Sequence, residues 1–489
     1  MNDLKEKYET VIGLEVHAEL NTKTKAFCGC ANKFGGLPNT NICPVCLGLP
    51  GSLPVLNEQL LYKAIKTGMA LNCEIAQKSK FDRKNYYYPD LPKAYQISQY
   101  DMPIAIKGFI EIVDKEGNRK RIGVTRAHME EDAAKLLHLT KSGQIGDAEE
   151  SLVDYNRGGV PLIEIVSEPD MHSAEEAYLY LSVIKAILKY IDVSDCNMEE
   201  GSLRCDANIS VRPRGQKELG TKVEIKNMNS FRGVQKAVDY EIERQMQMCE
   251  GREIIPQETR LWDAAKEKTF SMRSKEGSHD YRYFPEPDLP PMEISKALIE
   301  KIKKEIPELP AAKLDRFMKE YALSAYDADI LTQEHATSEF FEAVAKVSGE
   351  PKLSGNWVMG ELLGKMNQAG IKEIKDSKIT PAGLGKMIKL ITNSTISGKI
   401  AKQVFEEMFD TGEDPEKIVK DKGLIQITDA SAIEKIVDAV IAANPKIAGE
   451  IKAGKAAALG FLTGQVMKES KGKANPGMVN EILRKKILE

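Results

Sequence analysis

Four of the eight cysteines lie close together near the N-terminus, in two pairs separated by a loop: Cys28, Cys30, Cys43 and Cys46. Two close pairs of thiols provide four soft ligands, which suit tetrahedral zinc. All four thiolates would bind the metal and leave no coordination position open. The spacing therefore predicts a structural zinc site that does no catalysis itself. Four reduced thiols without a metal, or a redox pair among them, are the alternatives.

Carboxylates and imidazoles form a second group, on segments that are typical of β-strands. Glu15 and His17 share one face of a predicted strand, because side chains repeat with a period of two residues. Segment 128–132 contains three acids and a histidine, and Glu164 lies inside another apolar strand. Such side chains are hard ligands suited to magnesium, which in turn binds phosphate oxygens. From spacing alone a solvated sheet face explains them slightly better, because one sequence does not show which strands are neighbours.

The elements that must position these residues change character along the chain. Up to about residue 290, short strand-like runs dominate, with helices between them such as one that begins at Ser173. Four prolines within 285–291 indicate a stiff connector, and a polar segment at 410–415 indicates a further boundary. Helical periodicity dominates beyond the prolines. This pattern predicts an α+β part with a largely antiparallel sheet, followed by helical domains.

Composition limits the class of protein. The chain has 489 residues, of which 69 are basic and 73 acidic, for a formal charge of −4. This balance excludes a uniformly basic nucleic-acid coat and a disordered polyanion, and the length suits about three domains. No apolar run approaches the ~20 residues that cross a bilayer, and the first residues lack the apolar segment of a signal peptide. A soluble, cytoplasmic protein is expected.

The charge is unevenly distributed, because segment 451–489 carries eight basic residues against three acidic ones. A solvated helix face and a surface that contacts a phosphate backbone explain this excess equally well. Segment 449–455 matches the spacing of a phosphate-binding loop. We set this match aside because Ala456 stands where a hydroxyl would reach magnesium and no strand precedes it.

Seven segments of the first 290 residues resemble the B subunit of the aspartyl/glutamyl-tRNA amidotransferase, and they follow the family's order. They are 11–17, 81–86, 93–99, 128–132, 161–170, 201–208 and 280–288. In the tail, 457–468 and 474–476 are similar to the family's C-terminal domain. The resemblance spans essentially the whole chain, and so many motifs in order are far more specific than any single spacing above.

The resemblance implies an enzyme that converts Glu-tRNA(Gln), and in many organisms Asp-tRNA(Asn), into Gln-tRNA(Gln) and Asn-tRNA(Asn). Hydroxide is a poor leaving group, so ATP first phosphorylates the side-chain carboxylate and ammonia then attacks the acyl phosphate. In the family, the A subunit is an amidase that releases the ammonia from glutamine, and the small C subunit braces the heterotrimer. This chain would be the kinase and transamidase half, an ATP-consuming carbon–nitrogen ligase of translation.

The resemblance also implies an architecture. A cradle resembling glutamine synthetase, with a largely antiparallel sheet, is expected at 1–292. Two all-α C-terminal domains should follow, a helical domain at 293–408 and a helical tail at 409–489 that contacts the tRNA. Within the basic tail, Lys468, Lys471 and Lys473 are expected to contribute to tRNA affinity.

The site residues follow from the same resemblance. The expected ligands of magnesium are His17, Glu131 and Glu164, and Glu15 lines the same ATP pocket with Glu130 as its neighbour. Three further residues have expected roles. Arg204 would contact phosphate, Asp206 would support the residues that bind the metal, and Lys84 would contact the ammonia channel or the substrate. The four cysteines match the branch of the family that carries structural zinc.

Two other classes of function remain as alternatives at this point. One is a non-catalytic scaffold that binds tRNA and whose acidic sheet is merely solvated; it would not bind magnesium-ATP. The other is a free-standing ligase of glutamine-synthetase type that uses small amino acids, which leaves the helical C-terminal extension without a role.

Overall fold

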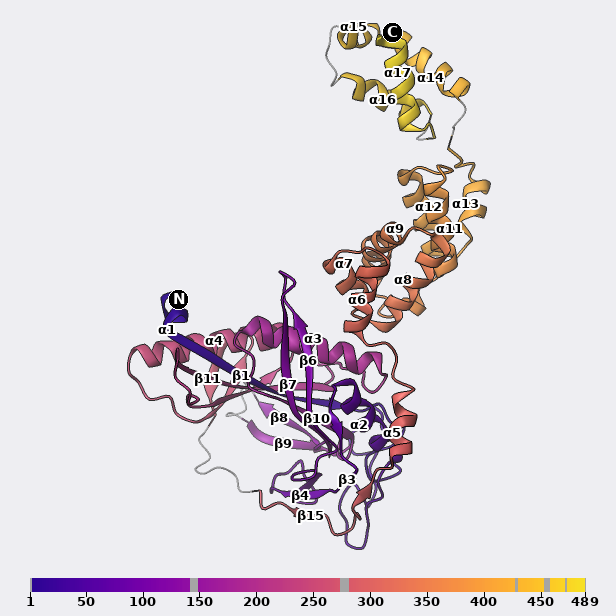
Figure 1. Ribbon diagram of the computed structural model, residues 1–489. Helices are drawn as coiled ribbons and strands as arrows, with labels where there is room; N and C mark the ends of the chain where they lie inside the picture. Colours follow the sequence, from indigo (N-terminus) through magenta and orange to yellow (C-terminus); the bar gives the residue numbers. More distant parts are fainter. Residues whose placement is uncertain are drawn as a thin grey trace. The chain divides into compact units, whose positions relative to one another are not determined.

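The computed structural model of the protein describes residues 2–140, 148–272, 281–426, 430–452, 458–470 and 473–488. The chain divides into two compact units, Met1–Ala312 and Lys313–Glu489. The first is built on a large sheet with helices, and the second is helical in its described residues (Figure 1). This is the α+β class that the sequence predicts, and the large sheet is antiparallel except at one strand pair.

Nine strands form the large sheet of the first unit, with β1 (Tyr8–Glu19) at its centre. On one side of β1 the order is β10 (Pro161–Ser167), β7 (Arg119–Glu131), β6 (Ala105–Val113) and β2 (Glu74–Ile75). On the other side it is β11 (Leu203–Pro213), β12 (Val223–Met228), β13 (Thr259–Asp263) and β14 (Lys268–Ser271). Segments from across the first 271 residues therefore meet on one surface.

Two long helices cover one face of this sheet (Figure 1). Helix α3 (Ala174–Tyr190) begins at Ser173 and α4 (Phe231–Glu250) begins at Ser230, and both serine hydroxyls accept a backbone N–H of the first turn. The two helices pack on each other, with α3 against β6 and β1 and α4 against β11 and β12. Their apolar faces form the main core with the inward side chains of the strands, such as Leu14, Val16 and Ile163.

Small sheets and further helices complete the first unit. A three-stranded sheet joins β4 (Asp82–Asn85), β5 (Tyr95–Ser98) and β15 (Phe284–Pro285), and it lies on the side of the large sheet away from α3 and α4 (Figure 1). The remaining elements are α1 (Asn2–Lys7), α2 (Glu58–Ala70), β3 (Lys78–Ser79) paired with β16 (Met292–Glu293), β8 (Lys135–Thr140) paired with β9 (Ala148–Asp154), and α5 (Lys296–Lys303).

Helices of the second unit surround two hydrophobic clusters. The first cluster lies among α6 (Pro310–Glu320), α7 (Ala325–Thr332), α8 (His335–Ser348), α9 (Pro351–Asn356), η2 (Trp357–Leu362), α10 (Leu363–Gln368), η3 (Ile374–Asp376), α11 (Pro381–Thr392), α12 (Gly398–Thr411) and α13 (Pro415–Asp421). The second lies among α14 (Ala430–Ala443), α15 (Pro445–Lys452), α16 (Ala458–Glu469) and α17 (Pro476–Leu488).

Along the chain, residues pass from one hydrophobic cluster to the next at positions later than the expected domain boundaries at 292/293 and 408/409. Ile302 of α5 is fully buried in the core of the first unit, so the segment directly after 292 packs with that unit. Ile418 and Val419 of α13 belong to the first helical cluster, whereas Ile433 is the first member of the second. Proline and glycine signals indicate where regular structure breaks, and side-chain packing decides which core a helix joins.

No helix in the described ranges combines the length and the low polarity that a membrane span requires.

Candidate active site and cysteine cluster

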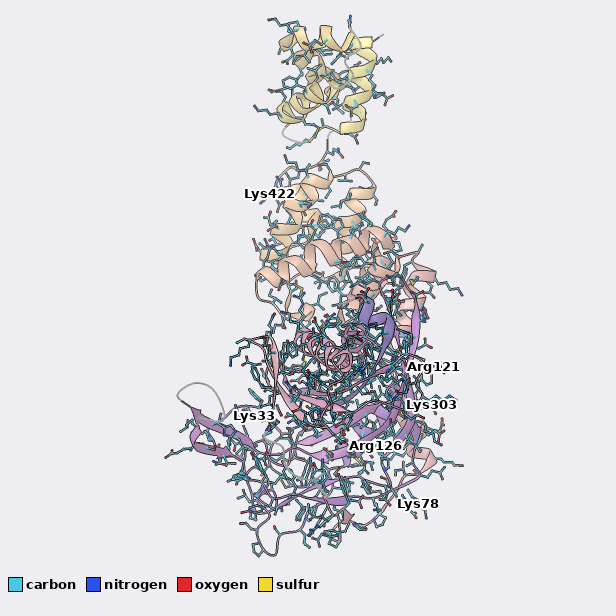
Figure 2. The ribbon with its side chains drawn as sticks, turned by 90° about the vertical axis from the view of Figure 1, so that its left-hand side faces the viewer. Lys33, Lys78, Arg121, Arg126, Lys303 and Lys422 are labelled. Atoms are coloured by element: carbon cyan, nitrogen blue, oxygen red, sulfur yellow. The ribbon has the colours of Figure 1, made fainter. Side chains whose placement is uncertain are left out.

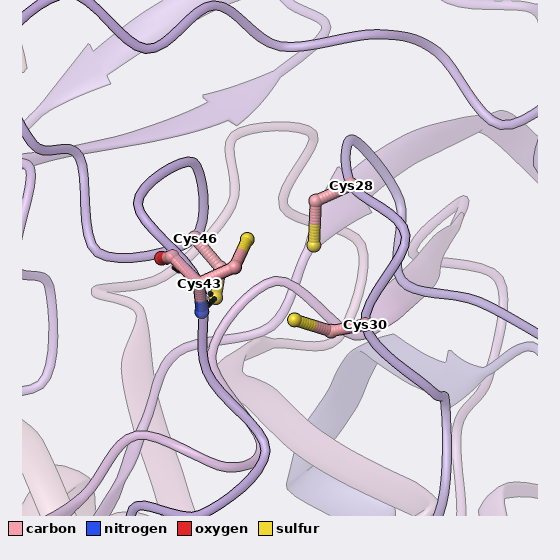
Figure 3. A group of neighbouring side chains, drawn as sticks. All are labelled: Cys28, Cys30, Cys43 and Cys46. Carbon is pink, nitrogen blue, oxygen red and sulfur yellow. Dashed lines mark hydrogen bonds between the residues drawn. The ribbon is translucent and has the colours of Figure 1, made fainter.

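The four cysteines converge as their spacing predicts. Cys28 and Cys30 extend from one segment toward Cys43 and Cys46 on the facing loop (Figure 3). Their sulfur atoms all lie within 4.8 Å of one another, close to the ~3.8 Å that separates sulfurs around a tetrahedral zinc with ~2.3 Å bonds. The backbone N–H of Cys43 also donates to Cys46 Sγ at 3.1 Å. The donor set therefore fits a structural zinc ion.

Among these thiols, Cys46 is the one most inclined to ionise. Its pKa is lowered to about 5, first by a hydrogen bond from Cys28 and further by the Cys43 backbone N–H and the nearby Lys25 ammonium. Burial raises the pKa of Cys30 to about 11, with hydrogen bonding to Cys43 as a further cause. The cluster thus already stabilises a thiolate, which is the form that binds metal.

The second site lies on the face of the large sheet opposite α3 and α4. Along β1 the side chains alternate, so that Glu15, His17 and Glu19 share this face while Leu14, Val16 and Ala18 are buried in the core. The register pairs His17 with Glu164 of β10 and with Arg204 of β11, and Glu15 with Asp206. The predicted sharing of a face by Glu15 and His17 is confirmed. We call this surface the polar face.

One group on the polar face has the geometry of a metal site. Ligand atoms of His17, Glu130 and Glu164 all lie within 4.8 Å of one another. His17 Nε2 is 3.3 Å from Glu164 Oε2, and His128 Nε2 lies 3.4 Å from the same oxygen and 3.2 Å from Glu130 Oε1. His17 is partly accessible, whereas Glu130 and Glu164 are buried. Two carboxylates and an imidazole fit a hard divalent cation. The strands that carry them are neighbours in the sheet, which spacing alone did not show.

Glu131, the expected third ligand, is not part of this group. Because side chains alternate along β7, Glu130 and His128 share the row of Glu164, whereas Glu131 is paired with Pro161 in the other row. Glu131 Oε1 accepts the Ile97 backbone N–H at 2.9 Å and pairs with the Lys93 ammonium. The side chain that the structure brings to His17 and Glu164 is thus Glu130, in place of the expected Glu131.

The buried charges around this group stabilise one another. Burial by itself lowers the pKa of His128, but the carboxylates of Glu164 and Glu130 outweigh it and raise the value to about 9. For Glu164, burial acts to raise the pKa, and the imidazoles of His128 and His17 nevertheless hold it well below its usual range. The Ser98 hydroxyl donates to Glu130 Oε1 at 2.6 Å, and Gln96 Nε2 donates to Glu130 Oε2 at 3.1 Å. The small sheet therefore fixes the carboxylate of Glu130.

A second acidic group lies beside the first. Glu15, Asp206 and Glu224 also place ligand atoms within 4.8 Å of one another, and Lys226 Nζ approaches Asp206 Oδ2 at 2.5 Å and Glu224 Oε1 at 3.1 Å. Burial, followed by the charge of Glu164, raises the pKa of Glu15. This crowding of carboxylates favours a cation. Glu224 and Lys226 were missed in the sequence, although the alternation Val223-Glu224-Ile225-Lys226 is the signal that could have found them.

Arg204 is held at the margin of the polar face by Asp132, whose Oδ2 accepts from Arg204 Nη2 at 2.6 Å. Glu19 lies next to Asp132, and burial together with the charge of Asp132 raises the pKa of Glu19 to about 8. Arg204 Nε is buried and makes no hydrogen bond with the described residues. The Arg204 side chain as a whole is 36% exposed, and its expected contact with phosphate stays a prediction.

Lys84 extends from β4 toward the carboxylates. Burial acts to lower its pKa, but Glu130 and then Tyr283 and Glu164 raise it well above the usual range. Its ammonium lies 5.1 Å from the centre of the Tyr281 ring. The structure thus brings Lys84 together with the predicted carboxylates, although it lies far from them in sequence.

The cysteine cluster and β7 share the wall of a small cavity. The cavity has a volume of about 70 Å³, and its lining includes Cys28 and Cys46 on one side and Lys93, Tyr95 and Glu131 on the other. The backbone of Gly159 connects the two sides, because its carbonyl accepts from Ala26 and its N–H donates to the Asp132 carbonyl. The loop that carries the cysteines therefore supports the end of β7 that carries Glu131.

Comparison with known proteins identifies the family. Residues 10–300 match the GatB/GatE catalytic domain, and residues 339–487 match the GatB domain. The B subunit of the aspartyl/glutamyl-tRNA(Asn/Gln) amidotransferase of Carboxydothermus hydrogenoformans is 59% identical over 98% of this chain and 99% of its own length. The chain belongs to this family. Proteins of the same name from a Thermoanaerobacter species and from Brevibacillus brevis are 57% and 54% identical, each over 98% of this chain.

Membership in the amidotransferase family makes this chain part of an enzyme that serves translation, and the catalytic-domain match covers every polar-face residue described above. The expected tRNA contacts lie elsewhere. Lys468 is exposed in the last turn of α16, and Lys473 is half-buried just before α17. Lys471 lies outside the described residues.

Proposed function

We propose that this chain phosphorylates the side-chain carboxylate of Glu-tRNA(Gln), Asp-tRNA(Asn) or both with ATP, and then transfers ammonia to the acyl phosphate. The observation that carries the proposal is the grouping of His17, Glu130 and Glu164 on a partly accessible polar face. The relatives from Carboxydothermus and Thermoanaerobacter are named as amidotransferases for both tRNAs. A solvated scaffold surface does not require buried carboxylates that are held by imidazoles.

Magnesium would be held by His17, Glu130 and Glu164, with Glu15, Asp206 and Glu224 as a second group for a cation. When bound, the metal supplies positive charge for the phosphate oxygens of ATP. Arg204 adds the charge of its partly exposed guanidinium, and the Lys84 ammonium adds charge from β4. These cations offset the negative charge that develops during phosphoryl transfer, where positioning and electrostatics provide most of the catalysis.

The chemistry needs protection from water, because an acyl phosphate hydrolyses readily. The small sheet of β4, β5 and β15 supplies Lys84, Gln96 and Ser98 to the polar face, and His128 and Glu130 are each only 2% exposed. The side of the site that contains His128 and Glu130 is therefore covered by this sheet and shielded from water, whereas His17 and Glu15 remain accessible to substrate. We place the acyl phosphate between these two sides.

The proposed assembly is a heterotrimer with an amidase, the A subunit, which supplies ammonia from glutamine, and with a small C subunit. The relatives are each named as one lettered part of an amidotransferase, which supports a complex of several different chains. Zinc at the four cysteines has a structural role in this proposal, since all four sulfur ligands come from the protein. Because aminoacyl-tRNA is made and used in translation, we place the enzyme in the cytoplasm.

The helical tail supplies tRNA contacts in this proposal. Reversing the charge of Lys468, Lys471 and Lys473 should weaken tRNA binding and reduce the slope of log affinity against log salt by about two to three units, because each lysine that contacts a phosphate releases about one counterion. Filter binding at several salt concentrations measures this slope. An unchanged slope would show that the lysines form a solvated helix face.

Co-expression of the chain with candidate A and C subunits tests the function directly. Amide formation on Glu-tRNA and on Asp-tRNA, assayed separately with ATP and glutamine, is expected with at least one of them. Amide formation on free glutamate instead would favour the free-standing ligase. Absence of magnesium-ATP binding by the assembled enzyme, measured by calorimetry, would favour the scaffold.

A further inference from the structure

Lys25 is a charged residue that the function does not use, and it is completely buried beside the cysteine cluster. Its side chain has no exposed surface. It packs against Gly159, because a Cβ atom on that glycine would lie 3.6 Å from Lys25 Cδ. An ammonium group in such a place costs several kcal/mol unless a counter-charge or hydrogen bonds compensate for it. The partners of Lys25 therefore need an explanation.

Those partners include no carboxylate within 4.0 Å among the described residues. Lys25 Nζ donates to the Asn41 backbone carbonyl at 3.0 Å, and it also lies 3.9 Å from Cys46 Sγ. By contrast, Lys313, a nearly buried lysine with 3% of its side chain exposed, lies 3.1 and 3.3 Å from two carboxylates. Without a metal, one carbonyl at 3.0 Å and one sulfur at 3.9 Å give the Lys25 ammonium less compensation than two carboxylates give Lys313.

The cysteine cluster supplies the missing negative charge once its sulfurs bind metal. Four thiolates carry −4 and zinc carries +2, so the assembled cluster carries −2 in a largely apolar loop. Cys46 is the buried member of the four, and the backbone N–H of Cys43 already donates to its sulfur. The ammonium of Lys25 approaches that same sulfur from the protein interior. The Lys25 ammonium and the negative charge of the metal-loaded cluster would therefore compensate for each other's burial.

We propose that Lys25 is the counter-charge of the zinc–tetrathiolate cluster and sets its affinity for zinc by pairing with Cys46. The inference rests on the proposed structural zinc. It makes Lys25 a positioning residue that acts on the metal through a ligand. Groups that touch metal ligands in this way commonly change metal affinity by about 10- to 100-fold when they are removed.

Two substitutions separate the charge of Lys25 from its hydrogen bond. Lys25→Gln loses the charge and keeps a donor for the Asn41 carbonyl, and Lys25→Met loses both. Lys33→Gln is the matched control, because Lys33 lies in the same loop with an exposed side chain (Figure 2). Each variant is made in the full chain and purified in the assembled enzyme.

Zinc affinity is measured by competition with a chromophoric chelator, and the ligand set is checked by the absorption of the cobalt(II)-substituted enzyme. We expect Lys25→Gln and Lys25→Met each to weaken zinc binding by about tenfold or more, with a tetrahedral cobalt–thiolate spectrum retained. Lys33→Gln should bind zinc as tightly as the unchanged protein. Unchanged affinity of Lys25→Gln would overturn the inference, because the hydrogen bond to Asn41 would then account for the lysine.

Thermal unfolding provides a second readout that a purely structural lysine would not reproduce. Lys25→Gln should lower the melting temperature of the zinc-loaded enzyme and have a smaller effect after a chelator has removed the zinc. An equal loss in both states would overturn the inference. Failure of Lys25→Gln to fold where Cys43→Ser folds would do the same, because the lysine would then serve folding itself. If the unchanged protein binds no zinc, the proposed structural zinc fails first, and that result is seen before any variant is compared.

Discussion

The cysteine cluster and the polar face are both groups of metal-binding side chains, but they are assembled in different ways. The four cysteines come from one segment of nineteen residues, 28–46, and the loop alone brings them together. The polar face takes its residues from strands as far apart in sequence as β1 and β12, and only the register of the large sheet makes them neighbours. Local spacing therefore predicts the first group well and the second poorly.

The two groups also differ in what surrounds them. All ligands of the cysteine cluster are thiols, which leaves no open position and suits a structural ion. The polar face mixes carboxylates, imidazoles and cations with one accessible side, which suits a reaction. We therefore expect substitutions on the polar face to change activity and substitutions in the cysteine cluster to change stability.

The largest effect is expected for Glu164→Gln. Glu164 Oε2 lies within 3.4 Å of both His17 and His128, so the substitution removes the anion that organises the group. Amide formation on Glu-tRNA should fall ~100-fold or more while glutaminase activity of the complex is largely retained. Glu168→Gln, on an exposed residue that follows the same strand, is the control. A similar loss in both variants would contradict the assignment.

A comparison of Glu130→Gln with Glu131→Gln tests the alternation along β7. Glu130→Gln should raise the magnesium concentration that gives half-maximal activity by about tenfold, because Glu130 belongs to the metal group. Glu131→Gln should leave this concentration unchanged, since its carboxylate pairs with Lys93 and the Ile97 backbone and is not part of the metal group. The reverse result would restore Glu131 as the ligand.

Cys43→Ser should affect stability and leave the chemistry largely intact. Loss of one of four ligands removes the zinc, and the melting temperature should fall by ~4–8 °C if the site contributes ~2 kcal/mol. Metal analysis and thermal unfolding measure the two effects. Cys249→Ser, on a cysteine outside the cluster, provides the control. A large fall in the rate of amide formation at a temperature where the variant is fully folded would show that the cluster has a direct part in catalysis.

The last effect, at Glu19, is seen only as pH changes, because the pKa of this residue is raised to about 8 by burial and by Asp132. An acid with a raised pKa holds its proton longer in the folded state than in the unfolded state. Its contribution to stability therefore decreases as pH rises from about 4.5 to about 8 and is constant above that. Glu19→Gln, which stays neutral, should become progressively more stable than the unchanged protein over this range. Melting curves between about pH 5 and pH 9 measure the difference, and a constant difference would contradict the pKa.

In the catalytic part, the sequence predicts some features of the site and leaves others undetermined. Alternation along β1 predicts that Glu15 and His17 share a face, and the structure confirms it. Alternation also predicts that the side chains of Glu130 and Glu131 diverge. The pairing of β7 with β10 decides which of these two side chains points into the site. Glu224 and Lys226 join the site through pairing of β12 with β11, which no local pattern specifies.

The sequence by itself determines the alternation of the strands, the change from strands to helices and the cysteine cluster, because each depends on residues close together in the chain. Its long motifs also determine the amidotransferase family. Only the tertiary structure decides that His17, Glu130 and Glu164 meet, that Glu131 does not join them, and that Lys25 is buried against Cys46. These contacts depend on strand register and on packing between distant segments, and a shift of one residue in the register of a strand would move its side chains to the opposite face.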